Sequence, residues 1–134
     1  VALEKECTAG ANTEIKNSVM QPGSSIHSGF IGDSVIGMNT SIGAETVIAN
    51  RKFRKNGERP EIKSELIGKD YNKASGRSFL GAAIGDNVDI GVNVSIMPGI
   101  QIGSDAKIGP GTVVKENVEN GETVYIEQKQ ARKK

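Results

Sequence analysis

Isoleucine recurs at every sixth position through the second half of the chain, and a glycine usually follows it. Five isoleucines keep this spacing without a break: Ile84, Ile90, Ile96, Ile102 and Ile108. An earlier block, IGDSV-IGMNTS-IGAETV, repeats the pattern with one residue missing from its first unit: Ile31, Ile36 and Ile42. Residues 1–30 carry the pattern only loosely.

A six-residue period fits neither the alternation of a strand nor the 3.6-residue turn of a helix. It is typical of a parallel β-helix, in which each hexad forms one short strand and one corner. Three hexads then make a triangular coil of about 18 residues, with the isoleucines stacked inside and small residues at the corners. We therefore predict an all-β fold, a left-handed parallel β-helix; hexapeptide helices of this kind are an exception to the right-handed crossover rule.

The hexads stop and start again, which divides the chain into four parts. We predict one β-helix domain over residues 1–134, cut from a longer protein because the chain starts in mid-pattern without Met. Its expected parts are N-terminal coils at 1–48, an inserted loop at 49–80, C-terminal coils at 81–114, and a closing strand and tail at 115–134.

The inserted loop has no hexads and is strongly basic at its start. Residues 51–59 hold five basic side chains against one glutamate. The segment EIKSELI and the region around Tyr71 favour a short hairpin. A long insertion in a compact domain is usually functional or disordered. The basic run therefore suggests a phosphate or nucleotide-like ligand, and a solvated loop is the alternative.

Composition narrows the classes of function. The net charge of +1 argues against nucleic-acid binding, and no apolar run approaches the roughly 18 residues of a membrane span. The single Cys7 excludes an intrachain disulfide and fits a cytoplasmic protein. With one histidine and one cysteine, a zinc site built on three imidazoles cannot form, so no metal is expected.

The only histidine, His27, lies just before the earlier isoleucine block, which begins at Ile31. A neutral imidazole could take a proton from an amine or hydroxyl nucleophile at neutral pH, although a lone histidine is more often a surface or packing residue. Short β-helices expose flat apolar faces, so we expect a homotrimer with ligand sites between its subunits.

The order of motifs resembles a known family. The run IHSGFIGDSVIGMNTSIGAETVIAN, residues 26–50, resembles the C-terminal acetyltransferase domain of bifunctional UDP-N-acetylglucosamine pyrophosphorylase / glucosamine-1-phosphate N-acetyltransferases. Residues 75–114 are similar to the archaeal-type sugar-phosphate nucleotidylyltransferases that carry the same domain. The resemblance implies transfer of acetyl from acetyl-CoA to an amino-sugar 1-phosphate, most simply glucosamine 1-phosphate, in UDP-N-acetylhexosamine synthesis. The N-terminal nucleotidylyltransferase domain is absent from this sequence.

The resemblance also assigns roles to individual residues. His27 falls on the catalytic base, and Lys16 on a lysine that binds the sugar phosphate. Asn50 falls on an asparagine of the acetyl-CoA and substrate site, and Ala44 on a residue that contacts acetyl-CoA largely through its backbone. Lys55 matches a second lysine for the sugar phosphate, in the loop.

At four further site positions the sequence departs from the family pattern. Phe30 replaces a tyrosine near the substrate and so loses a hydroxyl. Arg51 replaces a second tyrosine, and Val92 a serine, both on the cofactor side. Pro110, also on the cofactor side, stands where the family keeps a small residue and has no N–H to donate.

These departures leave two alternatives open. The domain could be a non-catalytic β-helix that trimerises or regulates a sugar-phosphate nucleotidylyltransferase. It could also be an acetyltransferase with another acceptor, such as galactosamine 1-phosphate or a sugar nucleotide.

Overall fold

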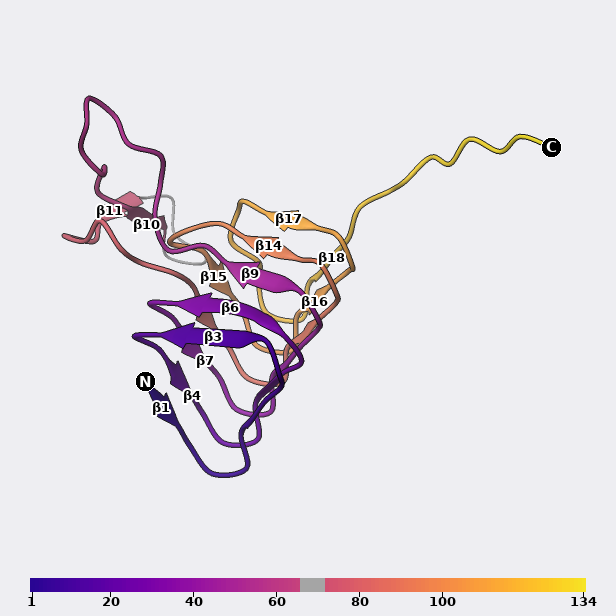
Figure 1. Ribbon diagram of the computed structural model, residues 1–134, viewed down its shortest axis with the longest axis horizontal. Coiled ribbons are helices and arrows are strands. Elements are labelled where there is room, and N and C mark those ends of the chain that lie inside the picture. Colours follow the sequence, from indigo (N-terminus) through magenta and orange to yellow (C-terminus); the bar gives the residue numbers. More distant parts are fainter. Residues whose placement is uncertain (66–71) are drawn as a thin grey trace.

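The computed structural model describes residues 1–65 and 72–134, and over these residues the chain winds into a stack of triangular coils (Figure 1). Short strands form the three sides of each coil, and every side stacks on the coils before and after it in parallel register. In the described part of the chain all regular elements are strands. The predicted all-β parallel solenoid is therefore confirmed, and its left hand stays a prediction.

Three sheets make the three sides. Sheet A consists of β1 (Ala2–Leu3), β4 (Val19–Met20), β7 (Val35–Ile36), β12 (Ala83–Ile84) and β15 (Gln101–Ile102). Sheet B consists of β2 (Thr8–Ala9), β5 (Ser25–Ile26), β8 (Ser41–Ile42), β13 (Asp89–Ile90), β16 (Lys107–Ile108) and β18 (Thr123–Val124). Sheet C consists of β3 (Thr13–Lys16), β6 (Gly29–Gly32), β9 (Thr46–Ile48), β14 (Ser95–Ile96) and β17 (Val113–Val114).

The core is the stack of inward side chains. In sheet B, Ile90 pairs with Ile42 on one side and Ile108 on the other, so the six-residue spacing places isoleucine over isoleucine. All three are buried. Burying an isoleucine side chain stabilises a fold by about 1.5–3 kcal/mol, so the repeated column supplies much of the driving force for coiling.

Each corner turns on residues with a left-handed backbone. At the corner between sheets A and B, Asn39, Asn87 and Asp105 have φ of 54°, 55° and 61°. Asparagine, aspartate and glycine tolerate this conformation better than other residues. These residue types also occupy the corners at Asn12, Asn17 and Gly23, although the first corner turns on Glu6, and this explains how a segment with weak hexads still forms β1 to β5.

The insertion leaves and rejoins the stack at the corner between sheets C and A, called here the C–A corner. The backbone N–H of Leu80 donates to the Asn50 carbonyl over 2.9 Å, which holds the two ends of the insertion together. Within the insertion, β10 (Lys63–Glu65) pairs antiparallel with β11 (Asn72–Ala74). This confirms the predicted hairpin over the described residues; Tyr71 lies outside them.

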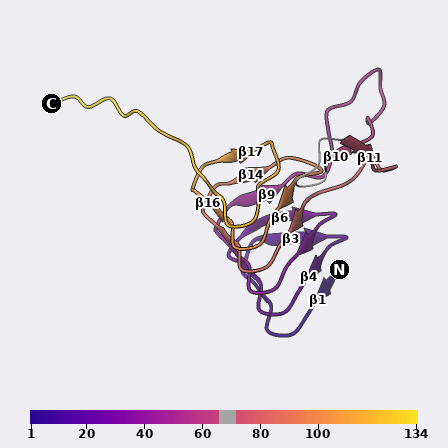
Figure 2. The ribbon, with the colours of Figure 1, turned by 180° about the vertical axis from the view of Figure 1, so that it is seen from behind.

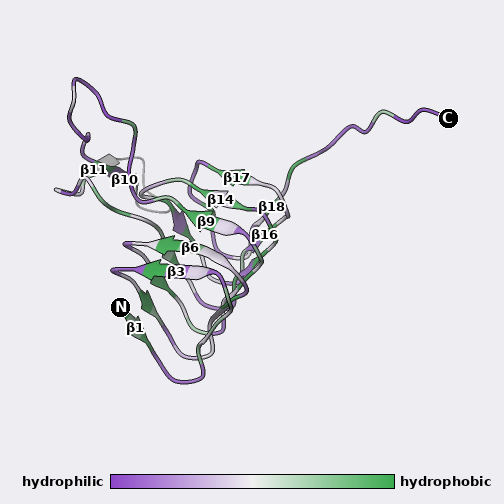
Figure 3. Cartoon of the chain, viewed as in Figure 1, coloured by the Kyte–Doolittle hydropathy of each residue, from purple (hydrophilic) through white to green (hydrophobic). Residues whose placement is uncertain are grey.

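The insertion projects from the stack, and near its hairpin it packs against the coil of Gly99 (Figures 1 and 2). Ile62 is fully buried against Gly99, and the Ser64 hydroxyl donates to the Gly99 carbonyl over 3.1 Å. The projecting loop is mostly hydrophilic in Figure 3, as is much of the C-terminal tail. Across the described residues, the chain has no helix of the length and apolar character that a membrane crossing requires.

Candidate functional site

Four of the residues singled out from the sequence line one hollow. Lys16, Phe30, Asn50 and Arg51 surround a space of about 480 Å³ on sheet C beside the C–A corner. The remaining wall includes Phe79, which belongs to the returning leg of the insertion. The hollow therefore combines two cationic side chains, the carboxylate of Glu14, an amide and two aromatic rings.

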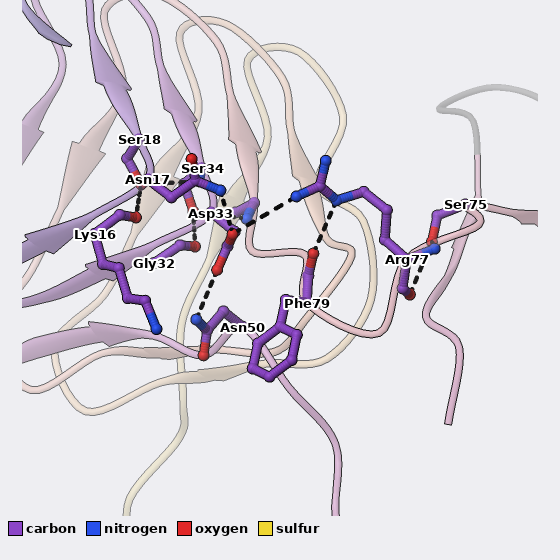
Figure 4. Close-up of polar contacts among 11 residues, drawn as sticks. Lys16, Asn17, Ser18, Gly32, Asp33, Ser34, Asn50, Ser75, Arg77 and Phe79 are labelled. Atoms are coloured by element: carbon purple, nitrogen blue, oxygen red, sulfur yellow. Dashed lines mark hydrogen bonds and ion pairs between the residues drawn. The ribbon is translucent and has the colours of Figure 1, made fainter. Parts of the chain in front are cut away.

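The returning leg of the insertion completes this hollow. Lys16 ends β3, and its ammonium nitrogen lies 5.9 Å from the centre of the Phe79 ring. This distance is within the range of a cation–π contact. Figure 4 shows the Lys16 ammonium and the Phe79 ring on either side of the Asn50 amide.

Asn50 is held from behind by a buried carboxylate. Its side-chain nitrogen donates to Oδ2 of Asp33 over 2.7 Å, and the side-chain nitrogen of Asn17 donates to Oδ1 over 2.6 Å. Asn50 is itself buried, yet it lines the hollow. A guanidinium nitrogen of Arg77 lies 3.8 Å from the same Oδ1. Figure 4 shows Asp33 at the centre of these contacts.

Gly32 leaves room for this arrangement. A Cβ at that position would lie 2.7 Å from the Asn50 side-chain nitrogen and 2.7 Å from an edge carbon of the Phe30 ring. Both distances are shorter than real Cβ contacts. The glycine of the Ile-Gly pair therefore serves the site as well as the turn.

The other group of predicted residues lies at the corner between sheets B and C, called here the B–C corner. The Ala44 carbonyl accepts from the N–H of Asn93 over 2.9 Å, and the Val92 carbonyl accepts from the N–H of Gly111 over 2.9 Å. These bonds stack Ala44, Val92 and Pro110 in neighbouring coils. His27 lies at the same corner in the preceding coil, where its backbone N–H donates to the Ile42 carbonyl over 3.0 Å.

The side chain of His27 is exposed. It has no hydrogen bond to any of the residues that the structure describes, so both ring nitrogens are open to solvent. A histidine sealed inside the coil would count against a role as base. The exposed ring keeps the predicted role possible.

Within one chain the two groups lie at opposite edges of sheet C. His27 precedes β6, whereas Asn50 follows β9, and the register pairs Gly29 with Thr46 and Ile31 with Ile48. In this register Asn50 lies beside position 33, six residues along the strand direction from His27. At roughly 3.3 Å per residue the two are up to about 20 Å apart. A single chain therefore brings Lys16, Asn50 and their neighbours together but leaves His27 at the other edge.

Lys55 lies in neither group. It sits in the exposed part of the insertion, where it pairs with Glu58 around a turn at Asn56 and Gly57, both of which have positive φ. An Asn-Gly pair favours such a tight turn, which the sequence analysis had missed.

Three guanidinium groups crowd the same loop. The pKa of Arg59 lies below its ordinary value because partial burial disfavours the charged form and because Arg51 and Arg54 add positive potential. One guanidinium nitrogen of Arg59 donates to the Lys52 carbonyl over 2.7 Å. An anion bound here would relieve this repulsion.

Three residues of the site were not predicted from the sequence: Asp33, Arg77 and Phe79. Asp33 follows the Ile-Gly pair at a corner and looks like an ordinary turn residue, while the other two stand in a segment without hexads. A second hollow of about 480 Å³ lies on the sheet A side of Asp33 and contains none of the predicted site residues. In the described part of the chain no three histidine, cysteine or acidic side chains are grouped as metal ligands.

Comparison with known proteins gives the same repeat. The family profile "Bacterial transferase hexapeptide (six repeats)" matches residues 81–116. A "Bifunctional sugar-1-phosphate nucleotidylyltransferase/acetyltransferase" of Sulfurisphaera tokodaii is 46% identical over 84% of this chain and 27% of its own length. A "Bifunctional protein GlmU" of Methanococcus aeolicus is 37% identical over 92% of this chain and 28% of its own length. The chain thus spans about a quarter of these relatives.

Solved acetyltransferase structures contain a similar fold. A serine acetyltransferase of Neisseria gonorrhoeae, in complex with serine, matches 84% of this chain and 39% of its own with a TM-score of 0.55 and 28% identity. A maltose O-acetyltransferase of Clostridium difficile matches 90% of this chain with a TM-score of 0.56 and 20% identity, which shows the fold alone. The resemblance predicted from the sequence is therefore confirmed: the chain carries hexapeptide repeats and is similar to one stretch of the bifunctional sugar-1-phosphate nucleotidylyltransferase/acetyltransferases.

Proposed function

We propose that this chain is an acetyl-CoA-dependent N-acetyltransferase whose acceptor is an amino-sugar 1-phosphate, with glucosamine 1-phosphate as the first candidate. The observation that carries the proposal is the hollow at the C–A corner, whose lining holds the two cations Lys16 and Arg51 against one carboxylate, Glu14, together with the Asn50 amide. Cations suit a sugar phosphate, and the amide suits a sugar hydroxyl or amine. The names of the relatives point to the same chemistry.

The reaction needs a base for the amine. His27 accepts a proton from the amino group of the sugar as its nitrogen attacks the thioester carbonyl of acetyl-CoA. A C–N bond forms, the C–S bond breaks, and coenzyme A leaves as the thiol after taking up a proton. The stack of Ala44, Val92 and Pro110 at the B–C corner extends from His27 along the coils and is the proposed track for acetyl-CoA.

This mechanism requires two chains at one site. The B–C corner of one chain, with His27, faces the C–A corner of a neighbour, with Asn50, and a threefold arrangement closes the ring. The outer surface of sheet C supports such contact, because Val47 and Val113 there are 42% and 51% exposed. We therefore propose that the protein is a homotrimer with three active sites, each formed between two subunits. We also propose that it acts in the cytoplasm.

The test is thiol release from acetyl-CoA against a panel of acceptors: glucosamine 1-phosphate, galactosamine 1-phosphate, a UDP-linked amino sugar and glucosamine without phosphate. We expect release with one of the phosphorylated acceptors and a fall of about 10²–10⁴-fold in kcat for His27→Ala. Unchanged turnover in His27→Ala would remove the histidine from the mechanism.

Shared sites can be tested by mixing subunits. His27→Ala and Asn50→Ala chains are each expected to be inactive alone. Refolded together in equal amounts, they should regain about a quarter of the parental activity, since one interface in four then pairs an intact His27 with an intact Asn50. No recovery in mixed trimers would contradict a site between chains.

The non-catalytic alternative rests on Phe30, Val92 and Pro110, which depart from the pattern of the resembling family. A stable trimer without thiol release on any acceptor, in a chain joined to its natural neighbouring domain, would favour that scaffold function.

A further inference from the structure

We propose that Asp33 is a positioning residue: it fixes the direction of the Asn50 side-chain amide, so that the hollow presents an oxygen acceptor to its ligand. The inference deepens the proposed function in one respect, since it takes the hollow beside Asn50 as the acceptor site. It adds that the ligand group met by Asn50 carries an N–H or O–H donor.

The direction of the amide follows from donor and acceptor chemistry. An ionised carboxylate can only accept hydrogen bonds, so the Asn50 atom 2.7 Å from Asp33 is the NH₂ group. The Asn50 oxygen therefore points the other way. In Figure 4 it points away from Asp33, between the Lys16 ammonium and the Phe79 ring, which both line the hollow.

The carboxylate is itself held in place. Its side chain is only 6% exposed, and Asn17 and Arg77 occupy Oδ1 while Asn50 occupies Oδ2. Asp33 does not line the hollow that contains Lys16 and Phe30, so it acts on a ligand there only through Asn50. Without this acceptor, the Asn50 amide could rotate and offer its NH₂ group to the hollow instead.

Arg77 connects the same carboxylate to the insertion. It approaches Asp33 from the returning leg, and its Nε donates to the Phe79 carbonyl over 3.0 Å. The Asp33 carboxylate, which orients Asn50, thus also contacts the returning leg of the insertion, and that leg contributes Phe79 to the hollow. Asp33 therefore helps to position both Asn50 and Phe79, which lie on different sides of the hollow.

The first test does not depend on turnover. The backbone of Asp33 is left-handed, with φ of 48°, so glycine can replace it without strain. In the parent we expect the Asn50 side-chain amide hydrogens to exchange slowly with water in ¹⁵N NMR spectra, and in Asp33→Gly to exchange rapidly. Asp105→Gly is the matched control, because Asp105 is an exposed corner residue with φ of 61°. Equally slow exchange in Asp33→Gly would overturn the inference.

The second test is kinetic. In Asp33→Gly, kcat/KM for the active amino-sugar phosphate should fall by about tenfold or more, as expected when a buried hydrogen bond to a charged group is removed. Most of the effect should appear in KM for the sugar and little in KM for acetyl-CoA. Asp33→Asn keeps one oxygen for Asn50. At the former Oδ1 the exposed Asn17 can turn its amide and the Arg77 guanidinium, 55% exposed, can move into solvent, so this variant should stay within a few-fold of the parent.

Asp105→Gly separates positioning from loss of stability. Its kinetics should match those of the parent at the same fraction folded. If Asp33→Gly and Asp105→Gly behave alike, Asp33 has no positioning role. If no acceptor is turned over by the parent, the proposed function fails, whereas the exchange measurement still decides whether Asp33 orients Asn50.

Discussion

The coils before and after the insertion share the isoleucine column but differ at the inward position two residues earlier. Before the insertion this position is polar at Ser34, Thr40 and Thr46, and after it the residues are Ala82, Val88 and Val94. All six are buried. The N-terminal coils thus place hydroxyl groups where the C-terminal coils, apart from Thr112, place aliphatic side chains.

The hydroxyl groups hold neighbouring coils together. Ser34 donates to the Gly32 carbonyl over 2.7 Å and accepts from the N–H of Ala82 over 3.0 Å. Thr40 makes the corresponding pair of bonds to Gly85 and Val88. The hollow lies on the hydroxyl-bearing coils, next to the corner of Gly32 and Asp33. The comparison suggests that regular aliphatic coils supply stability, while the polar coils fix the corner that carries the site.

The largest effect is expected from the regular coils. Ile96 is fully buried between Ile48 and Val114, so Ile96→Ala should lower the free energy of unfolding by about 2–5 kcal/mol. Urea unfolding measures this loss. The hollow is untouched, so KM at low temperature should not change. A loss well below 1 kcal/mol would break the proposed division between the two regions.

Gly32→Ala should have the next largest effect, and it should fall on the site. The added methyl group must displace the Asn50 amide or the Phe30 ring, with a cost of about 1–3 kcal/mol for overpacking. We expect a raised KM for the sugar phosphate. Gly85→Ala, whose methyl group would meet Ser104, is the control: it should destabilise the fold without changing KM.

Ser34→Ala sharpens the comparison at the inward hydroxyl. It leaves the buried N–H of Ala82 without its partner, which costs about 1–3 kcal/mol. We expect a loss in the free energy of unfolding near the lower end of this range, since the methyl group of alanine fits the space left by the Ser34 side chain. Ser41→Ala, an exposed position on sheet B, should stay within about 0.5 kcal/mol of the parent.

Phe79→Leu should produce the smallest effect. The cation–π contact with Lys16 is worth about 0.5–1 kcal/mol at an exposed site, so KM for the sugar phosphate should rise about two- to fivefold. Phe79→Tyr retains the aromatic face and should match the parent. A leucine variant with parental KM would mean that the insertion contributes no wall to the ligand site.

Much of the fold was predictable because the signal is local and repeated. The spacing from Ile84 to Ile108 specifies strand, corner and inward side chain six residues at a time, and the parallel pairing of Ile90 with Ile42 follows. Residues 1–30 were harder to read. Their coils depend on corner residues such as Asn12 and Asn17, with φ of 60° and 49°, more than on regular isoleucines.

The site was predictable only in part. Lys16, Phe30 and Asn50 were found through their resemblance to a family motif, and the structure gathers them with Arg51 around one hollow. The roles of His27, Lys55, Ala44, Val92 and Pro110 stay predictions. Phe79 and Arg77 carry no periodic signal, so nothing in the sequence placed them against residues 16 and 33.

By itself the sequence determined the repeat and the inward column, because both follow from neighbours a few residues apart, whereas His27 as base stays a prediction from the family resemblance. The tertiary structure decided which corner carries the hollow, how the insertion returns to it, and that Asp33 holds Asn50. These contacts join coils 16 or more residues apart and a loop that has no period. Stacking fixes them, since a residue's neighbours in a solenoid lie one coil away.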